Sequence, residues 1–186
     1  VFSFDPLHQR LNLIIVSSTI LLSALGNDDT SLGGESWTKK MFVDSKACTG
    51  CRVCELICSV RHEKKIRPRK ARLRIVSEYP PGIDMPMVCR QCGRAPCIVS
   101  CAVNALEREM KTGAVVVTDA CVGCGVCMEA CPFGAVTFDL DEKVPLICNL
   151  CRGEPVCVKY CPTGALKYST PEAYIASRGR ALASKW

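Results

Sequence analysis

Aromatic residues and histidines are scarce in this chain of 186 residues. Aromatics make up 6% of it, so a conventional apolar core would be thin. The two histidines, His8 and His62, stand in no recognisable catalytic arrangement. The apolar run from Leu11 to Leu25 is short for a membrane span, which needs about twenty residues, and no twin arginine precedes it. We therefore expect a cytoplasmic protein without direct membrane insertion.

Cysteine is abundant instead. Sixteen cysteines form four motifs of four, each opening with C-x2-C and closing with C-x3-C, while the middle gap varies. The motifs are Cys48, Cys51, Cys54, Cys58; Cys89, Cys92, Cys97, Cys101; Cys121, Cys124, Cys127, Cys131; and Cys148, Cys151, Cys157, Cys161. This is the ligand count for four [4Fe–4S] clusters, at four thiolates each. Metal binding would then carry much of the folding free energy.

Two other uses of cysteine fit the spacing less well. Disulfides between such close neighbours would be strained. Structural zinc also takes four thiolates, but usually from two separated C-x2-C pairs rather than from triplets with a fourth cysteine close behind. Pro132 and Pro162 complete the C-x3-C-P ending of bacterial ferredoxins in the third and fourth motifs. A zinc-stapled interaction module remains the remote alternative.

The formal charge of +6 would by itself suggest a nucleic-acid binder. Four clusters with their thiolates would bring about eight negative charges, which the basic excess offsets. Residues 61–74 hold eight lysines or arginines and one glutamate. This linker is either a solvated loop that balances cluster charge or a docking patch for an acidic partner or an electron carrier. No aromatic residue interleaves it, so we expect no nucleic-acid partner.

Local patterns predict short elements around the motifs. The stretches at 115–117 (Val-Val-Val) and 136–138 (Val-Thr-Phe), of β-branched and aromatic residues, favour short strands. The segments that close each motif, from third to fourth cysteine, are expected to form single helical turns. Thr170, Pro171 and Glu172 make a good helix start, with a helix through about Ala183. We expect Glu63, Glu129 and Asp139 to be surface charges rather than acid–base groups.

The four motifs together resemble the four-cluster iron–sulfur subunits of anaerobic oxidoreductases. The resemblance rests on CTGCRVCELICSVRHE (48–63), CRQCGRAPCIVSC (89–101), CVGCGVCMEACPFGAV (121–136) and CNLCRGEPVCVKYCPTGAL (148–166), and covers roughly residues 41–168. It is specific for a four-cluster subunit and much less so for the enzyme that the subunit serves. Ser59 and Ala102 stand where a ferredoxin motif would have proline, which removes no ligand.

The resemblance implies crosswise ligation, in which three cysteines of one motif are joined by the fourth cysteine of another. The implied sets are Cys48, Cys51, Cys54, Cys161 (first set); Cys58, Cys148, Cys151, Cys157 (second set); Cys89, Cys92, Cys97, Cys131 (third set); and Cys101, Cys121, Cys124, Cys127 (fourth set). The implied fold is α+β, with two bacterial-ferredoxin-like two-cluster modules. Residues 41–75 plus 145–168 form the first module, and 85–140 form the second, inserted into the first. Residues 1–40 are expected to be an N-terminal extension and 169–186 a helical tail.

The expected function is electron transfer without catalysis, because complete cysteine quartets leave no iron open to substrate. The same completeness argues against a radical or hydratase enzyme. The resemblance implies a catalytic oxidoreductase partner, favouring the tungsten pterin group of aldehyde oxidoreductases and benzoyl-CoA reductases. Hydrogenases, formate dehydrogenases and carbon monoxide dehydrogenases are the alternative partners. A further redox subunit or a soluble ferredoxin would complete the electron path.

Overall fold

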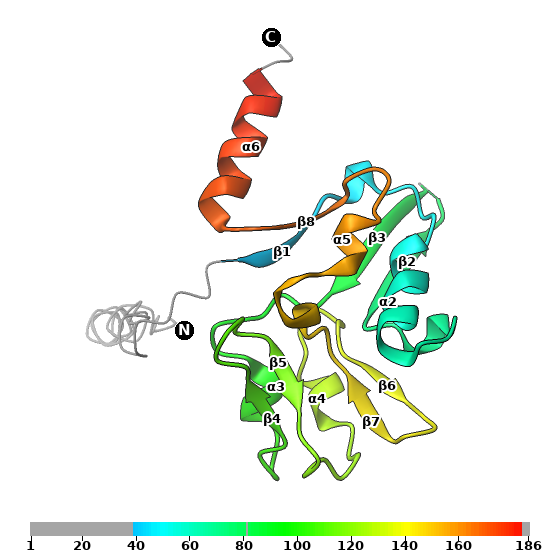
Figure 1. The fold of residues 1–186 in the computed structure, drawn as a ribbon, viewed down its shortest axis with the longest axis vertical. Coiled ribbons are helices and arrows are strands. Elements are labelled where there is room, and N and C mark those ends of the chain that lie inside the picture. The colour runs from blue at the N-terminus through cyan, green and yellow to red at the C-terminus, as the bar shows by residue number, and fades with distance from the viewer. Residues whose placement is uncertain (1–38, 81, 184–186) are drawn as a thin grey trace, which may run out of the picture. The chain divides into compact units, whose positions relative to one another are not determined.

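The computed structural model describes residues 39–80 and 82–183, and this part has the expected α+β composition of short strands and short helices (Figure 1). Its eight strands form four two-stranded antiparallel sheets. The sheets are β1 (Lys40–Val43) with β8 (Leu166–Ser169), β2 (Leu73–Glu78) with β3 (Ile83–Val88), β4 (Leu106–Arg108) with β5 (Val115–Val117), and β6 (Thr137–Asp139) with β7 (Val144–Leu146).

The α-helices are α2 (Val53–Glu63), α3 (Pro96–Val99), α4 (Val126–Glu129), α5 (Val156–Lys159) and α6 (Pro171–Ala183). Short 3₁₀ segments are η2 (Ser45–Ala47), η3 (Pro68–Lys70) and η4 (Leu150–Gly153). Among these described helices, none is long and apolar enough to cross a membrane. The expected extension at 1–40 lies outside the described residues, apart from its last two, and Lys40 already belongs to β1.

Three of the four predicted helical turns are confirmed, since α3, α4 and α5 have four residues each. The first is wrong, because α2 continues for eleven residues. Its buried residues Cys54, Glu55, Cys58 and Ser59 form one stripe that faces the core, which favours a longer helix. The helix ends at Glu63, and Lys64 caps it with a left-handed backbone and an N–H that donates to the carbonyl of Val60.

The first and last parts of the described chain lie together. Strand β1 pairs with β8, with Met41 opposite Tyr168, and both Met41 and Leu166 are buried. Helix α2 packs against α5, and Figure 1 shows the two helices next to each other. The segments that carry the first and fourth motifs are therefore neighbours, although more than a hundred residues separate Cys54 from Cys161.

The second and third motifs lie together in the same way. Helix α3, which carries Cys97, packs against α4, which carries Cys127. The hairpins β4–β5 and β6–β7 follow these motifs, as Figure 1 shows below the β1–β8 sheet. Strand β5 confirms the predicted strand at 115–117, and β6 begins one residue later than predicted.

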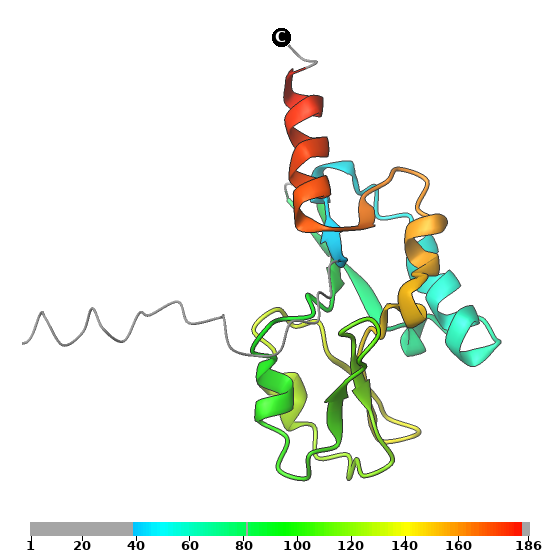
Figure 2. The same cartoon turned by 60° about the vertical axis from the view of Figure 1, so that its left-hand side comes forward.

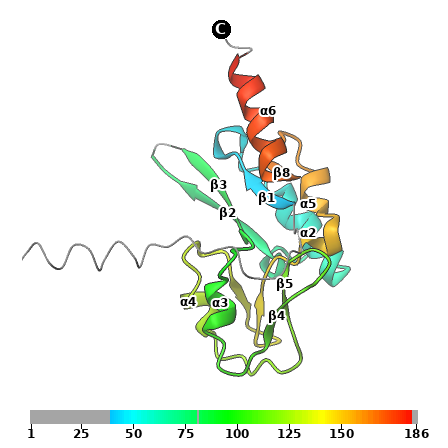
Figure 3. The same ribbon diagram turned by 90° about the vertical axis from the view of Figure 1, so that its left-hand side faces the viewer.

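Hairpin β2–β3 was not predicted, because the preceding linker was interpreted by its charge. Leu73 and Ile75 of β2 and Pro86 and Val88 of β3 are buried, whereas alternate residues face away from the core, as expected for a hairpin with one buried face. In Figure 3 the hairpin extends from the rest of the described part. The linker at 61–74 is therefore only partly a loop, because it begins in α2 and ends in β2.

Helix α6 confirms the predicted C-terminal helix. The hydroxyl oxygen of Thr170 accepts a hydrogen bond from the N–H of Ala173, at 3.2 Å, and caps the helix. The helix rises from the β1–β8 sheet (Figure 2), and the ring of Tyr174 stacks on Phe42 of β1 with the centroids 4.0 Å apart. An ion pair of 2.5 Å between Arg178 and Asp44 adds a second attachment.

The core joins both pairs of motifs through apolar side chains and cysteines. Its largest fully buried side chains include Met41, Leu73, Ile147, Leu150 and Leu166. Seven of the predicted cysteine ligands belong to the same buried cluster, namely Cys54, Cys58, Cys89, Cys97, Cys127, Cys148 and Cys157. As expected from the low aromatic content, sulfur and aliphatic groups fill this interior.

Candidate metal centres

The first set of cysteines surrounds one hollow. Cys48, Cys51, Cys54 and Cys161 line a space of about 300 Å³ that Ile75 and Pro86 of hairpin β2–β3 close on another side. Cys54 comes from the first turn of α2, whereas Cys161 follows α5. The pairing of β1 with β8 and the packing of α2 on α5 bring these distant segments to the same hollow.

The third and fourth sets surround two hollows of similar size. Cys89, Cys92, Cys97 and Cys131 line a space of about 330 Å³. Cys101, Cys121, Cys124 and Cys127 line another, also of about 330 Å³. Each hollow again combines three cysteines of one motif with one of another. Each of the three hollows is lined by four cysteines, the number of ligands that one [4Fe–4S] cluster takes.

The cysteines of the second set, Cys58, Cys148, Cys151 and Cys157, are all buried. Burial, followed by the negative charges of Cys148, Cys58 and Cys151, raises the pKa of Cys157. Burial also raises the pKa of Cys58, and the charge of Cys151 adds to it. These four thiols are therefore near enough to interact electrostatically.

A local backbone feature recurs in the first three motifs. Arg52, Ala95 and Gly125, each just before α2, α3 or α4, have φ of 56°, 34° and 77°. This left-handed step reverses the chain between the opening C-x2-C pair and the third cysteine. Gly123 lies inside such a pair with φ of 71°, and a Cβ there would come within 2.4 Å of the carbonyl oxygen of Lys143. Glycine is therefore required at that position.

Burial makes the thiols hard to ionise without a metal. It raises the pKa of Cys54 and Cys148 to about 12, and that of Cys89 and Cys127 to about 11. Because a thiol must lose its proton to bind iron, metal binding would release protons and stabilise the folded chain.

Several N–H groups point at sulfur. The backbone N–H of Arg72 donates to Sγ of Cys58 at 3.3 Å, and that of Ala105 donates to Sγ of Cys101 at 3.2 Å. Burial alone would raise the pKa of Cys161, but hydrogen bonds from the backbone of Leu166 and from Thr163 hold it below its usual value. Such bonds stabilise thiolate and tune the reduction potential of a cluster that the thiolate binds.

The donor set fits a [4Fe–4S] cluster. All sixteen cysteines are free, and four thiols around a hollow are the ligands that such a cluster takes. Within residues 39–80 and 82–183, no three or more histidine, cysteine, aspartate or glutamate side chains are gathered closely enough to hold a single metal ion.

Neighbouring sets are close to one another. After burial, the charge of Cys54 in the first set helps to raise the pKa of Cys157 in the second. Cys89 of the third set acts in the same way on Cys148 of the second. Cys97 of the third set acts on Cys127 of the fourth. The first and second, the second and third, and the third and fourth sets are therefore each near enough to interact electrostatically.

Two residues near the sets were missed from the sequence. Nε2 of His62 lies 4.0 Å from Sγ of Cys151, and burial, with the cations Arg72, Arg61 and Lys64, lowers its pKa to about 4. Its position four residues after Cys58 on a helix could have shown that it shares the face of that cysteine. Gln91 is also buried, and no signal in the sequence distinguishes it.

One charge expectation was wrong. Asp139 was expected at the surface, but it is buried, 6% exposed, and pairs with Lys70. Glu63 is only partly exposed, whereas Glu129 is exposed as expected.

Family models match most of the motif-bearing region. A 4Fe-4S dicluster domain matches residues 83–170, and a 4Fe-4S binding domain matches residues 45–61. Among curated proteins, the polyferredoxin-like subunit of aliphatic sulfonate oxidoreductase from Pyrococcus furiosus is 44% identical over 86 residues, 46% of this chain and 49% of that protein. Formate hydrogenlyase subunit 2 of Escherichia coli K12 is 36% identical over 85 residues, 45% of this chain and 40% of that protein.

This chain thus spans about half the length of the curated relatives it matches. Among solved structures, one titled as the active site complex BamBC of benzoyl coenzyme A reductase is 27% identical, with a TM-score of 0.43, covering 70% of this chain and 75% of the other. The matched 4Fe-4S domains and the sixteen cysteines are consistent with four [4Fe–4S] clusters. Residues 83–170 are therefore identified as a 4Fe-4S dicluster domain, and residues 45–61 as a 4Fe-4S binding domain.

Proposed function

We propose that this chain is a polyferredoxin that conducts electrons between a catalytic oxidoreductase subunit and a redox partner through four clusters ligated crosswise. The observation that carries the proposal is the composition of the three hollows, each lined by three cysteines of one motif and one of another. The ligands would be the four cysteines of each set defined above. The burial and mutual proximity of the second set support the same arrangement there.

The sequence of neighbouring sets supports a linear electron path. The first and fourth sets would lie at its ends, and these contain the exposed cysteines Cys51 and Cys124. The second set is buried throughout. Ends near the surface suit a protein that passes electrons to another molecule. When bound, the clusters would supply one-electron redox chemistry, while the chain excludes water and sets their potentials through N–H···S bonds.

The division into two modules belongs to the same proposal. Residues 41–75 and 145–168 would form one two-cluster module, with residues 85–140 inserted between them as the second. The β1–β8 pairing and the α2–α5 contact support the first module, and the α3–α4 contact supports the second. The link between modules includes Gln91, whose Nε2 donates to the carbonyl of Cys148 at 2.6 Å and whose Oε1 accepts from Val115 at 3.0 Å.

For the catalytic partner we favour a tungsten pterin enzyme of the aldehyde oxidoreductase or benzoyl-CoA reductase type, as the resemblance of the motifs implies. The chain is 44% identical to the aliphatic sulfonate oxidoreductase subunit and 36% identical to formate hydrogenlyase subunit 2. The higher value favours a partner of the aliphatic sulfonate oxidoreductase kind over a formate hydrogenlyase. We also propose a cytoplasmic location, a reducing compartment in which the sixteen thiols stay available for iron.

A second candidate is the equivalent subunit of a hydrogenase or formate dehydrogenase complex. It is favoured by the identity to formate hydrogenlyase subunit 2 and to electron transport protein HydN of Escherichia coli, 34% over 89 residues. The two candidates differ in the metal of the catalytic subunit, so metal analysis separates them.

The test is anaerobic purification from the native host with all partners retained, followed by measurement of Fe, Zn, W, Mo and Ni. We expect about sixteen Fe per chain beyond what the partner subunits hold. Stoichiometric tungsten would support the favoured partner, whereas molybdenum or nickel would support the second candidate. Four zinc ions with little iron, in a colourless protein, would overturn the electron-transfer proposal.

A further inference from the structure

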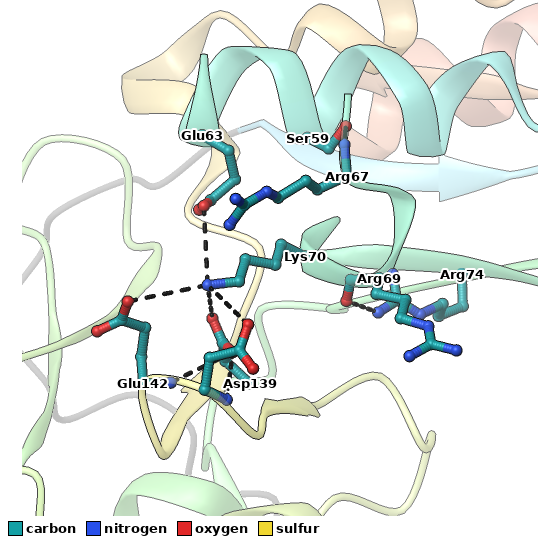
Figure 4. Close-up of polar contacts among 9 residues, drawn as sticks. Ser59, Glu63, Arg67, Arg69, Lys70, Arg74, Asp139 and Glu142 are labelled. Atoms are coloured by element: carbon teal, nitrogen blue, oxygen red, sulfur yellow. Dashed lines mark hydrogen bonds and ion pairs between the residues drawn. The ribbon is translucent and has the colours of Figure 1, made fainter. Parts of the chain in front are cut away.

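Five exposed cations gather in one short segment. Arg61, Lys64, Lys65, Arg67 and Arg69 are all exposed, and we call residues 61–69 the basic segment. Its one acid, Glu63, turns toward Lys70 at 3.9 Å (Figure 4), and Ile66 stands among the cations with 71% of its surface exposed. The segment thus presents positive charge around an apolar centre.

The backbone of the basic segment is held in place while its cationic side chains remain outside. The hydroxyl of Ser59, which is buried, accepts from the N–H of Arg67 at 3.1 Å. The guanidinium of Arg74 donates to the carbonyl oxygens of Pro68, at 2.8 Å, and of Arg69 (Figure 4). A surface ordered before binding loses less entropy when a partner docks.

The basic segment adjoins the second set of cysteines. His62 lies within it, is partly exposed, and places Nε2 4.0 Å from Sγ of Cys151. Just after it, the N–H of Arg72 donates to Sγ of Cys58. One side chain therefore extends from the cationic surface to a proposed ligand of the buried second set.

Neutralising cluster charge does not by itself account for this arrangement. A cation that serves the interior is expected to point inward, as Lys70 does when it pairs with Asp139. The five cations of the basic segment are exposed to solvent instead, where they attract an oppositely charged molecule. Such attraction increases the rate of association and selects acidic partners.

We propose that the basic segment is the docking surface for an acidic electron-carrier protein, with electrons crossing beside His62 at the second set. This rests on the proposed electron-transfer function and names the partner's chemistry and place. In each encounter one electron leaves the reduced carrier, which is oxidised, and enters this chain, which is reduced. No bond forms or breaks, and the carrier supplies the electron.

The test uses the full, cluster-loaded chain with an acidic two-cluster bacterial ferredoxin as the probe. The variant R61E/K64E/K65E reverses three cations of the basic segment. The matched control, K39E/K111E/R180E, makes the same charge change at exposed cations elsewhere. Affinity is measured by calorimetry and the second-order rate constant by stopped flow, at ionic strengths of about 0.01 M and about 0.15 M.

We expect the basic-segment variant to lose about tenfold or more in rate and to bind the ferredoxin more weakly at low salt, and to lose the salt dependence. The control should stay close to the wild type. Equal losses in both variants, or a wild-type rate that is insensitive to salt, would overturn the proposal. So would a DNA duplex that binds more tightly than ferredoxin through the same three cations.

The two proposals can fail separately. All proteins must first show wild-type iron content and bleaching by titanium(III) citrate. A wild-type chain that bleaches but exchanges no electrons with any carrier would contradict the electron-transfer function, and the affinities would still test the surface. A basic-segment variant with wild-type affinity and rate would contradict only the docking surface.

Discussion

The ammonium nitrogen of Lys70 lies 2.8 Å from Oδ2 of Asp139, and both residues are buried. Lys70 is in η3, after the first motif, and Asp139 ends β6, after the third. Glu63, Asp141 and Glu142 also lie within 4 Å of the same nitrogen (Figure 4). One cation thus holds together carboxylates from two regions far apart in the sequence. Removing it would leave Asp139 buried without a counter-charge.

Lys70→Met should lower the melting temperature of the loaded protein at neutral pH. The hydrogen bond from Lys70 to Asp139 raises the pKa of Lys70. Burial by itself would raise the pKa of Asp139, but the hydrogen bond from Lys70 and those from the backbone of Asp141 and Glu142 hold it below its usual value. The contribution of the pair is therefore lost as pH falls through the lowered pKa of Asp139, and as pH rises through the raised pKa of Lys70. Circular dichroism melting across pH checks this.

The difference in melting temperature between the variant and the wild type should be full at neutral pH and shrink in acid. Lys65→Met removes an exposed cation of the same type and should change little. A difference that persists undiminished below the usual aspartate pKa of 3.8 would contradict this account.

Gln91→Leu should destabilise the protein by about 1–3 kcal/mol, the cost of leaving buried hydrogen-bonding groups unpaired. It removes the partners of the Cys148 carbonyl and of the Val115 N–H. Leucine keeps the volume and apolar contacts, so the loss reports on the hydrogen bonds. Denaturant unfolding under anaerobic conditions measures it, and a change near zero would show that the bonds contribute no net stability.

Cys161→Ala should remove about four iron atoms per chain, the content of one cluster. Under crosswise ligation, alkylation followed by mass spectrometry should then find Cys48, Cys51 and Cys54 newly reactive. Cys157→Ala is the matched control and should expose the remaining cysteines of the second set, Cys58, Cys148 and Cys151. New reactivity of Cys148 and Cys151 in the Cys161 variant would show that each motif ligates its own cluster.

A chain that begins at Lys39 should assemble all four clusters. Such a chain retains the whole of β1, including Met41, which is buried against the core. Iron content and the visible spectrum of the reconstituted truncation, beside the full chain, measure assembly. Reduced iron in the truncation would mean that residues 1–38 contribute to folding.

Local elements were predictable where one short pattern decides them. The run at 115–117 became β5, and the capping residues at 170–172 began α6 as expected. The length of α2 and the hairpin β2–β3 were not anticipated, because charge dominated the interpretation of the linker. The burial of Asp139 depends on Lys70, nearly seventy residues away, and no local pattern reports such a partner.

The sequence by itself determined the number of thiols and their grouping, because C-x2-C spacing is a property of one loop. It also carried the resemblance that implied crosswise sets. Only the tertiary structure decided which fourth cysteine lies at each hollow. Cys54 and Cys161 meet because β1 pairs with β8 and α2 packs on α5. Such contacts between distant segments exist only once the chain has folded, since closing a long loop costs entropy that packing must offset.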